Sequence, residues 1–200
     1  MAPFFERLEA ADKCATLAIN SLHCPALDAI WMFFSDKLVW APLYLLVIFF
    51  LFRKLGWRKA IAVTISAVLT VLLCDQLGNL CKNGTMRLRP CYDAFMVSGG
   101  LRLLEGEGNL FGFYSAHAAN AMGFALVTAL GFRLNGKGRY RAYSGLIVLW
   151  ALLVGVSRIF VGKHFLGDVL VGFAVGALIG TLCALLAHWG VARLVRKGCT

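Results

Sequence analysis

The sequence has few charged residues, no closely paired cysteines and no stretch typical of a cleavable signal peptide. Charged side chains make up 15% of the 200 residues and hydrophobic ones 60%, which disfavours an ordinary soluble domain. None of the seven cysteines forms a Cys-x-x-Cys pair, so the usual zinc and redox motifs are missing. The first twelve residues lack a basic stretch followed by an apolar one. The composition therefore predicts an integral membrane protein of one domain.

The excess of positive charge is not arranged for nucleic-acid binding. The formal net charge is +10, but no basic stripe alternates with exposed aromatic residues, so nucleic acid is not an expected partner. Lys and Arg stand in short clusters between apolar runs, an arrangement that encodes membrane topology. No carboxylate cluster suits a divalent metal ion, and neither a metal nor another cofactor is expected. Cys81 and Cys91 bracket a polar loop and could form a disulfide in an oxidising compartment, which spacing alone does not decide.

Apolar runs predict an all-α fold. Five spans are predicted, over 38–52, 60–80, 115–132, 142–156 and 164–189. A long polar loop over 81–113 and a tight connection over 157–163 join them, and small residues on the last span predict close helix packing. These small residues are Gly172, Gly176 and Gly180. Residues 4–20 mix apolar and charged side chains and predict an amphipathic helix at the membrane interface. We expect a polytopic membrane helix bundle of five to six transmembrane helices plus this N-terminal helix.

The basic clusters orient the predicted bundle. The turns at 53–59 and 133–141 and the C-terminal tail fall on one face, and short loops rich in Lys and Arg stay cytoplasmic. The polar loop over 81–113 and the starts of the third and fifth spans fall on the opposite face. We therefore expect a multi-pass protein of the bacterial cytoplasmic (inner) membrane, with its active site facing the periplasm or the outside.

The stretch from Val154 to Gly172 places ionisable residues in apolar, glycine-rich sequence. Charges at membrane depth are unfavourable, usually face a protein interior or a water-filled cavity, and often mark function. His164 and Asp168 are four residues apart and would share one face of a helix. The carboxylate can then hold the imidazole in one tautomer and stabilise its cation. Arg158 has the planar fork that suits a phosphate.

Two further polar segments lie at span ends on the same predicted face. Lys82 is followed after six residues by Arg89 and Pro90, and Ser115 and His117 open the third span. Free backbone N–H groups at the start of a helix attract an anion. A phosphate monoester carries between one and two negative charges at neutral pH, which three cations around two histidines would balance.

Together, these segments resemble the three signature motifs of the type 2 phosphatidic-acid phosphatase family, membrane lipid phosphatases related to the vanadium haloperoxidases. The family pattern is Lys, six residues, Arg-Pro; then Pro-Ser-Gly-His; then Ser-Arg, five residues, His, three residues, Asp. The first motif matches in full. The third also matches in full, at Ser157, Arg158, His164 and Asp168. The second keeps Ser115 and His117 but has Tyr114 and Ala116 in place of Pro and Gly.

The resemblance implies a role for each matched side chain. His164 would attack phosphorus and form a phosphohistidine, Asp168 would orient it, and His117 would protonate the leaving oxygen. The groups that would bind the phosphoryl oxygens are Lys82, Arg89, Ser115, Ala116 and Arg158. It also implies metal-independent chemistry.

Several residues near the motifs differ from the family pattern or have no role in it. Ala116 keeps the backbone N–H of the family's Gly and would be strained only at positive φ. Tyr114 loses the rigidity of Pro but can carry a polar group at the interface. Asp75 is interpreted as structural and could pair with an Arg, while Lys163 and Arg102 have no assigned role.

The expected function is hydrolysis of a phosphate mono- or pyrophosphate ester on an outer-leaflet lipid by a single integral membrane phosphatase domain over 1–200. An interfacial segment would cover 1–35 and the catalytic core 60–187. Undecaprenyl diphosphate or phosphatidylglycerol phosphate is the expected substrate, and a lipid A phosphatase or lipid phosphotransferase of the same family is the alternative. A catalytically silent lipid-binding or transport protein is the alternative from another class. The expected partners are the lipid phosphate and membrane lipids, and the sequence does not report the oligomeric state.

Overall fold

A computed structural model describes residues 2–136 and 140–197, and within these ranges the protein is helical without strands. The main helices are α1 (Ala2–Asn20), α2 (Pro25–Ser35), α3 (Ala41–Leu55), α4 (Trp57–Thr85), α6 (Ala116–Gly131), α7 (Arg141–Phe160) and α8 (Leu166–Lys197). Short elements are α5 (Ala94–Ser98) and the 3-10 turns Leu38–Trp40, Pro90–Tyr92 and Phe132–Asn135. The predicted basic residues Lys137 and Arg139, the side chains of Arg196 and Lys197, and Cys199 lie outside the described part. The predicted all-α fold is confirmed.

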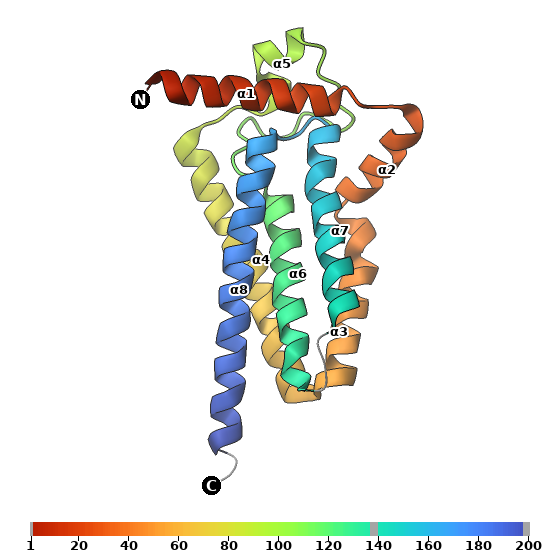
Figure 1. Ribbon diagram of the computed structural model, residues 1–200, viewed down its shortest axis with the longest axis vertical. Coiled ribbons are helices and arrows are strands. Elements are labelled where there is room, and N and C mark those ends of the chain that lie inside the picture. The colour runs from red at the N-terminus through yellow and green to blue at the C-terminus, as the bar shows by residue number, and fades with distance from the viewer. Residues whose placement is uncertain (1, 137–139, 198–200) are drawn as a thin grey trace.

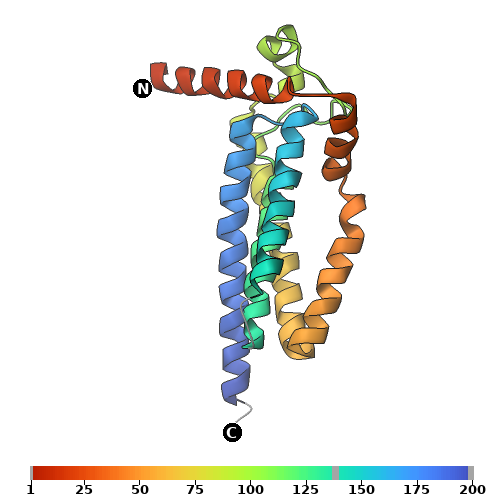
Figure 2. The same cartoon turned by 45° about the vertical axis from the view of Figure 1, so that its right-hand side comes forward.

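The bundle is built around α6. This helix packs against α4, α7 and α8, while α3 packs mainly on α4 and completes the bundle at one side (Figures 1 and 2). Most side chains of α6 are buried because it is rich in alanine and glycine, which let its neighbours approach closely. The predicted N-terminal helix is confirmed as α1. It lies across one end of the bundle and is bent by 117° from α2 (Figure 1).

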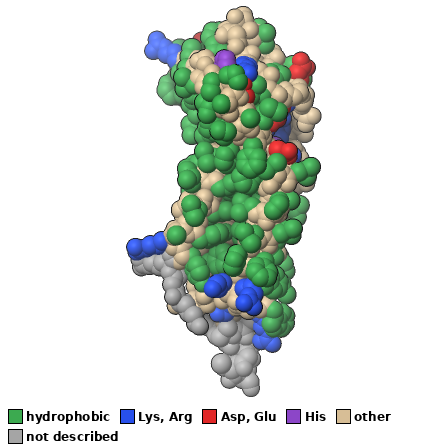
Figure 3. All heavy atoms as spheres, turned by 90° about the vertical axis from the view of Figure 1, so that its right-hand side faces the viewer, with side chains coloured by type: hydrophobic (Ala, Val, Ile, Leu, Met, Phe, Trp, Pro, Cys, Tyr) green, Lys and Arg blue, Asp and Glu red, His purple; other side chains and the backbone are tan. Residues whose placement is uncertain are grey.

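Apolar surface covers the length of the bundle. Among the residues that the structure describes, four helices are long and apolar enough to cross a membrane: Leu38–Leu55, Trp57–Thr85, Arg141–Phe160 and Leu166–Arg193. With 16 residues, α6 is about 24 Å long at the helical rise, shorter than a bilayer core, but its neighbours enclose it. Figure 3 shows a broad hydrophobic band with Lys and Arg side chains below it, as expected for a membrane protein.

Glycines on α8 allow its close contact with α6. A Cβ atom at Gly172 would lie 2.6 Å from the carbonyl oxygen of Ser115, and one at Gly180 would lie 2.5 Å from that of Gly123. At Gly176 a Cβ atom would overlap the carbonyl oxygen of Ala119. The predicted small-residue face is therefore the α6–α8 interface, which brings the beginnings of these two helices together.

The predicted boundary between the second span and the polar loop is wrong. Helix α4 continues to Thr85, so Lys82 lies in a helix. Met86 then ends it in the left-handed conformation, with φ of 47° and an N–H that donates to the Lys82 carbonyl oxygen at 3.0 Å. The sequence prediction ended the span where hydrophobicity ended, but helical hydrogen bonding continues beyond it. Cys81 and Cys91 are free thiols, so the structure does not contain the disulfide that their spacing allowed.

The tight connection between the last two spans is also shifted. Arg158 lies in the last turn of α7, and α8 begins only at Leu166, so His164 belongs to the connection instead of the helix. The prediction that His164 and Asp168 share a helix face is therefore wrong. Their contact instead forms at the start of α8, where Asp168 Oδ2 faces His164 Nδ1 at 3.3 Å and also accepts the Phe165 N–H at 3.1 Å.

Candidate active site

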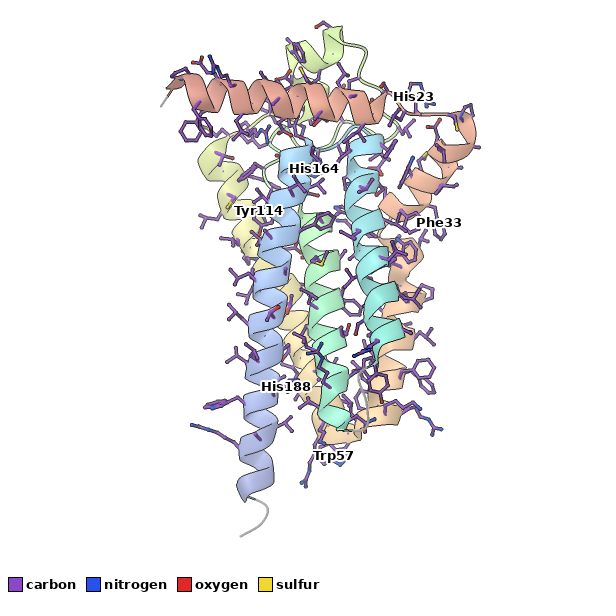
Figure 4. The ribbon with its side chains drawn as sticks, viewed as in Figure 1. His23, Phe33, Trp57, Tyr114, His164 and His188 are labelled. Atoms are coloured by element: carbon purple, nitrogen blue, oxygen red, sulfur yellow. The ribbon has the colours of Figure 1, made fainter. Side chains whose placement is uncertain are left out.

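The three polar segments meet at the end of the bundle beneath α1. The Ser115 N–H donates to the Asp168 carbonyl oxygen at 3.0 Å, which joins the second segment to the third. The Arg89 Nε donates to the Phe111 carbonyl oxygen at 3.3 Å. A Cβ atom at Gly112 would lie 3.0 Å from Arg89 Cγ and 3.5 Å from Asp168 Oδ2, so the first segment adjoins the third across this glycine. Figure 4 shows His164 at the same end of the bundle.

The carboxylate of Asp168 orients the imidazole of His164. The distance from His164 Nδ1 to Asp168 Oδ2 is 3.3 Å, and the same oxygen accepts the Phe165 N–H at 3.1 Å. The two residues are 2% and 0% exposed. Because the carboxylate engages Nδ1, the proton is held there and Nε2 keeps its lone pair.

His164 is held in its neutral form. Burial lowers its pKa to about 4, against the opposing effect of Asp168, and the charges of Arg158 and Arg89 add to the lowering. The sequence led us to expect that Asp168 would favour the cation. Burial outweighs that effect, so the imidazole is neutral at physiological pH, the form in which a ring nitrogen has a free lone pair.

Arg158 is buried, and its Nε lacks a hydrogen-bond partner. Its side chain is 4% exposed, and Nη1 donates to both Glu105 carboxylate oxygens, at 3.1 and 3.2 Å, and to the Ser35 hydroxyl. The Arg158 Nε is buried without a partner. A buried donor without a partner is unfavourable unless a ligand fills it, and an oxygen of a phosphate group would satisfy it.

The other predicted phosphate ligands differ in their surroundings. Within 2–136 and 140–197, no carboxylate forms an ion pair with Lys82 or Arg89, so neither cation is already neutralised by a carboxylate of the protein. The structure gives Lys82 no side-chain hydrogen bond to the other candidate residues it describes. Lys163 donates to the Gly106 carbonyl oxygen and so ties down the polar loop. Arg102 donates to Asp28 Oδ1 at 2.7 Å and ties the same loop to α2.

The second segment forms the start of α6. Ser115 is fully buried and caps the helix, its hydroxyl oxygen accepting the Ala118 N–H at 3.5 Å. Ala116 has no positive φ, so the change from the family's Gly introduces no backbone strain there. Tyr114 is 1% exposed instead of lying at the interface, and its hydroxyl donates to the Cys74 carbonyl oxygen at 2.8 Å. It anchors the segment to α4, which replaces the rigidity that Pro would supply.

His117 lies where two cavities meet. The first, of about 460 Å³, is mostly apolar and runs between α3, α4 and α6. The second, of about 690 Å³, is lined by Arg158 and Glu105. His117 lines both. One imidazole thus lies between an apolar cavity and a cavity lined by charged side chains of both signs.

The apolar cavity contains a polar pair. Asn120 Nδ2 donates to Asp75 Oδ1 at 2.9 Å, and Asn120 Oδ1 is buried without a partner. The partner of Asp75 is thus an amide, where the sequence had suggested an Arg. Both residues line the cavity below His117.

Residues 57–191 match the sequence profile of the PAP2 superfamily. The chain belongs to the PAP2 superfamily. It is a membrane lipid phosphatase of that superfamily and a hydrolase of phosphate esters, as its motifs predicted. A curated protein of Bacteroides thetaiotaomicron named lipid A 4'-phosphatase is 31% identical over 191 residues, covering 94% of this chain and 82% of its own length.

Two solved PAP2 structures resemble the fold. A transmembrane PAP2 type phosphatidylglycerolphosphate phosphatase from Bacillus subtilis superimposes with a TM-score of 0.70 at 22% identity, over 91% of this chain and 87% of its own. LpxE from Aquifex aeolicus gives a TM-score of 0.60 at 27% identity, over 86% and 92%. The bundle is thus the PAP2 membrane fold.

Several residues around the PAP2 motifs were missed from the sequence. Ser35 and Glu105 hold Arg158, and Asp12 and Arg87 contact the residues around His164. Arg87 lies between the motif residues Lys82 and Arg89, and this position in the sequence could have indicated a role at the site. Asp12 resembled any charged residue on the polar face of an amphipathic helix, and nothing local distinguished it.

Proposed function

We propose that the chain hydrolyses a phosphate monoester on an outer-leaflet lipid, without a metal ion, through a phosphohistidine at His164. The observation that carries this proposal is a buried neutral imidazole whose Nδ1 faces Asp168 and whose Nε2 remains free. Arg89 and Arg158 supply positive charge next to it. A single phosphatase domain over 1–200, with its catalytic core over 60–187, is part of the proposal.

In the first step, Nε2 of His164 attacks phosphorus and the bond to the lipid oxygen breaks. Protonated His117 gives its proton to that oxygen, so the lipid leaves as an alcohol. The dianionic substrate favours the protonated form of His117 by its charge. Lys82, Arg89 and Arg158, with the hydroxyl of Ser115 and the backbone N–H of Ala116, stabilise the equatorial oxygens as charge spreads over them.

In the second step, water hydrolyses the phosphohistidine. Neutral His117 takes a proton from the water molecule, whose oxygen bonds to phosphorus while the P–N bond breaks. Inorganic phosphate leaves, His164 returns to its neutral form, and His117 is protonated again. Asp168 stabilises the positive imidazole ring of the intermediate.

A glucosamine-based lipid of the lipid A type is the proposed substrate. The resemblance to a lipid A 4'-phosphatase over 94% of this chain supports it. So does the Asp75–Asn120 pair, because an acceptor inside an apolar cavity suits a headgroup with hydroxyl and amide N–H donors. Phosphatidylglycerol phosphate is the second candidate, supported by a 39% identical segment of phosphatidylglycerophosphatase B from Bacillus subtilis. Undecaprenyl diphosphate has weaker support.

Phosphate release from a panel of lipids tests this proposal. We expect purified protein with EDTA to release inorganic phosphate from lipid A faster than from phosphatidylglycerol phosphate, undecaprenyl diphosphate or phosphatidic acid. Asp75→Leu should lower kcat/KM for lipid A by about 10-fold, because the lipid A headgroup loses a polar contact. For phosphatidic acid, which makes no such contact, kcat/KM should change by less than about 2-fold. Equal losses on both lipids would exclude a role of Asp75 in substrate selection.

The same assay tests the reaction type. Abolition of activity by EDTA would exclude the metal-free mechanism, and transfer to a lipid acceptor without phosphate release would indicate a phosphotransferase.

We also propose that the site faces the periplasm or the outside of a cytoplasmic membrane. The support is the basic composition of the turn between α3 and α4, with Arg53, Lys54, Arg58 and Lys59, at the end of the bundle away from His164 (Figure 4).

Cysteine labelling of intact cells tests this orientation. In a protein with all seven cysteines replaced, Asn109→Cys should react with a membrane-impermeant maleimide and Trp57→Cys should not. Both positions are exposed in the structure, and neither replacement removes a basic residue. Permeabilised cells should label both and serve as the control. Labelling of Trp57→Cys alone in intact cells would reverse the orientation.

A further inference from the structure

Arg87 contacts the carboxylate that orients the proposed nucleophile. Its Nη1 donates to Asp168 Oδ1 at 2.7 Å, while the other oxygen of Asp168 faces His164. The side chain of Asp168 is fully buried, and Arg87 forms its ion pair. The sequence motifs give Arg87 no role, because it lies between Lys82 and Arg89 at a position that the family pattern leaves open.

Asp12 of α1 holds Arg87 from the other side. Arg87 Nη2 donates to Asp12 Oδ2 at 2.6 Å, and Asp12 Oδ1 accepts the Gly167 N–H at 2.7 Å. The guanidinium also lies over the ring of Phe165, 4.3 Å from its centroid. Two carboxylates, of Asp12 and Asp168, and the ring of Phe165 therefore hold the Arg87 guanidinium in place beside His164.

The geometry requires a guanidinium. Its planar fork presents two donors in fixed directions, so one side chain bridges two carboxylates, which a lysine ammonium cannot do with the same geometry. Burial lowers the pKa of Arg87, but the charges of Asp168 and Asp12 raise it further, so the pair remains ionic. Without this charge, Asp168 would be a buried carboxylate with only the neutral His164 and a backbone N–H as partners.

We propose that Asp12 and Arg87 are positioning residues for the nucleophile: α1 holds the Arg87 guanidinium, which fixes Asp168 and thereby the His164 ring. The inference rests on the proposed role of His164. It gives the N-terminal helix a part in catalysis, in addition to lying at the membrane surface. The simpler alternative is that the Asp12–Arg87 pair only docks α1 onto the bundle.

A matched control separates these two alternatives. Lys13 is the neighbour of Asp12 and also docks α1, through an ion pair with Asp93 at 2.9 Å that has no link to Asp168. If the Asp12–Arg87 pair only docks α1, Lys13→Gln and Asp12→Asn should lower kcat to the same extent. If the pair positions the nucleophile, only Asp12→Asn and Arg87→Gln should lower kcat.

The test measures kcat and KM of the full-length protein on the best lipid of the panel. We expect Arg87→Gln to lower kcat by about 10- to 100-fold and Asp12→Asn by about 3- to 10-fold, with KM changed less than about 3-fold, because the effect is on the reacting group. The double variant should be no slower than Arg87→Gln alone, since both act through one chain of contacts. Lys13→Gln should stay within about 2-fold of the unchanged protein.

Additive losses in the double variant, or an equal loss in Lys13→Gln, would overturn the inference. If Arg87→Gln does not fold, Asp12→Asn decides alone, because it keeps the shape of the side chain and removes only its charge; an unchanged kcat would then refute positioning. Retained activity in His164→Ala would refute the proposed function itself. An inactive His164→Ala with unchanged Asp12→Asn and Arg87→Gln would refute only the present inference.

Discussion

Replacing His164 by alanine is expected to lower kcat for lipid phosphate hydrolysis by about 10⁴-fold or more. The substitution removes the Nε2 atom that we propose bonds to phosphorus. In the described part of the chain, Asp168 contacts no second imidazole that could take its place. The remaining cations would still bind the phosphate group, so affinity for the substrate should persist. Phosphate release in detergent micelles measures the effect.

A second histidine, away from the proposed site, gives the control. His188 lies in α8, toward the opposite end of the bundle from His164, and contacts the Leu130 carbonyl oxygen at 3.0 Å (Figure 4). His188→Ala should keep activity within about 2-fold. Brief reaction with labelled substrate followed by denaturation in alkali should trap phosphohistidine in the unchanged protein and in His188→Ala, but not in His164→Ala. Normal turnover in His164→Ala would show that another group attacks phosphorus.

Replacing His117 by glutamine is expected to lower kcat by about 10³-fold on a lipid whose leaving group is an alcohol, within the range for general acid catalysis. An alkoxide is a poor leaving group and needs the proton that His117 supplies. A nitrophenyl phosphate carrying an alkyl chain has a much better leaving group. Its first step should therefore slow by less than about 10-fold.

The burst phase separates the two roles of His117. Because the same residue also activates water in the second step, His117→Gln should release one equivalent of nitrophenol rapidly and then turn over slowly. Stopped-flow absorbance measures both phases. The control is Asn120→Ser, since Asn120 lies one turn along α6 on the wall of the apolar cavity. This variant should not show a rapid release of nitrophenol followed by slow turnover. Equal losses on both leaving groups would contradict the general-acid role.

The residues of the three motifs were identifiable from the sequence because their spacing is a local property of the chain. His164 and Asp168 are four residues apart, and the Lys82–Arg89 spacing is read directly from the sequence. The spans were also predictable, since hydrophobicity over about 20 residues sets where a helix can cross a bilayer. Helix ends were less predictable. The ends of α4 and α7 depend on backbone hydrogen bonds that continue past the apolar residues.

Tertiary structure decided everything that depends on distant partners. It joined Arg158 to Ser35, which is 123 residues away, and Arg87 to Asp12, which is 75 residues away. It also placed Tyr114 in the core and buried His164 so deeply that the imidazole is neutral despite its carboxylate. No local pattern encodes these contacts, because they arise from how α1, α2 and the polar loop close over the end of the bundle. The sequence by itself thus determined the family and the membrane helices and predicted the reacting groups that we propose, whereas packing determined the charge state and orientation of those groups.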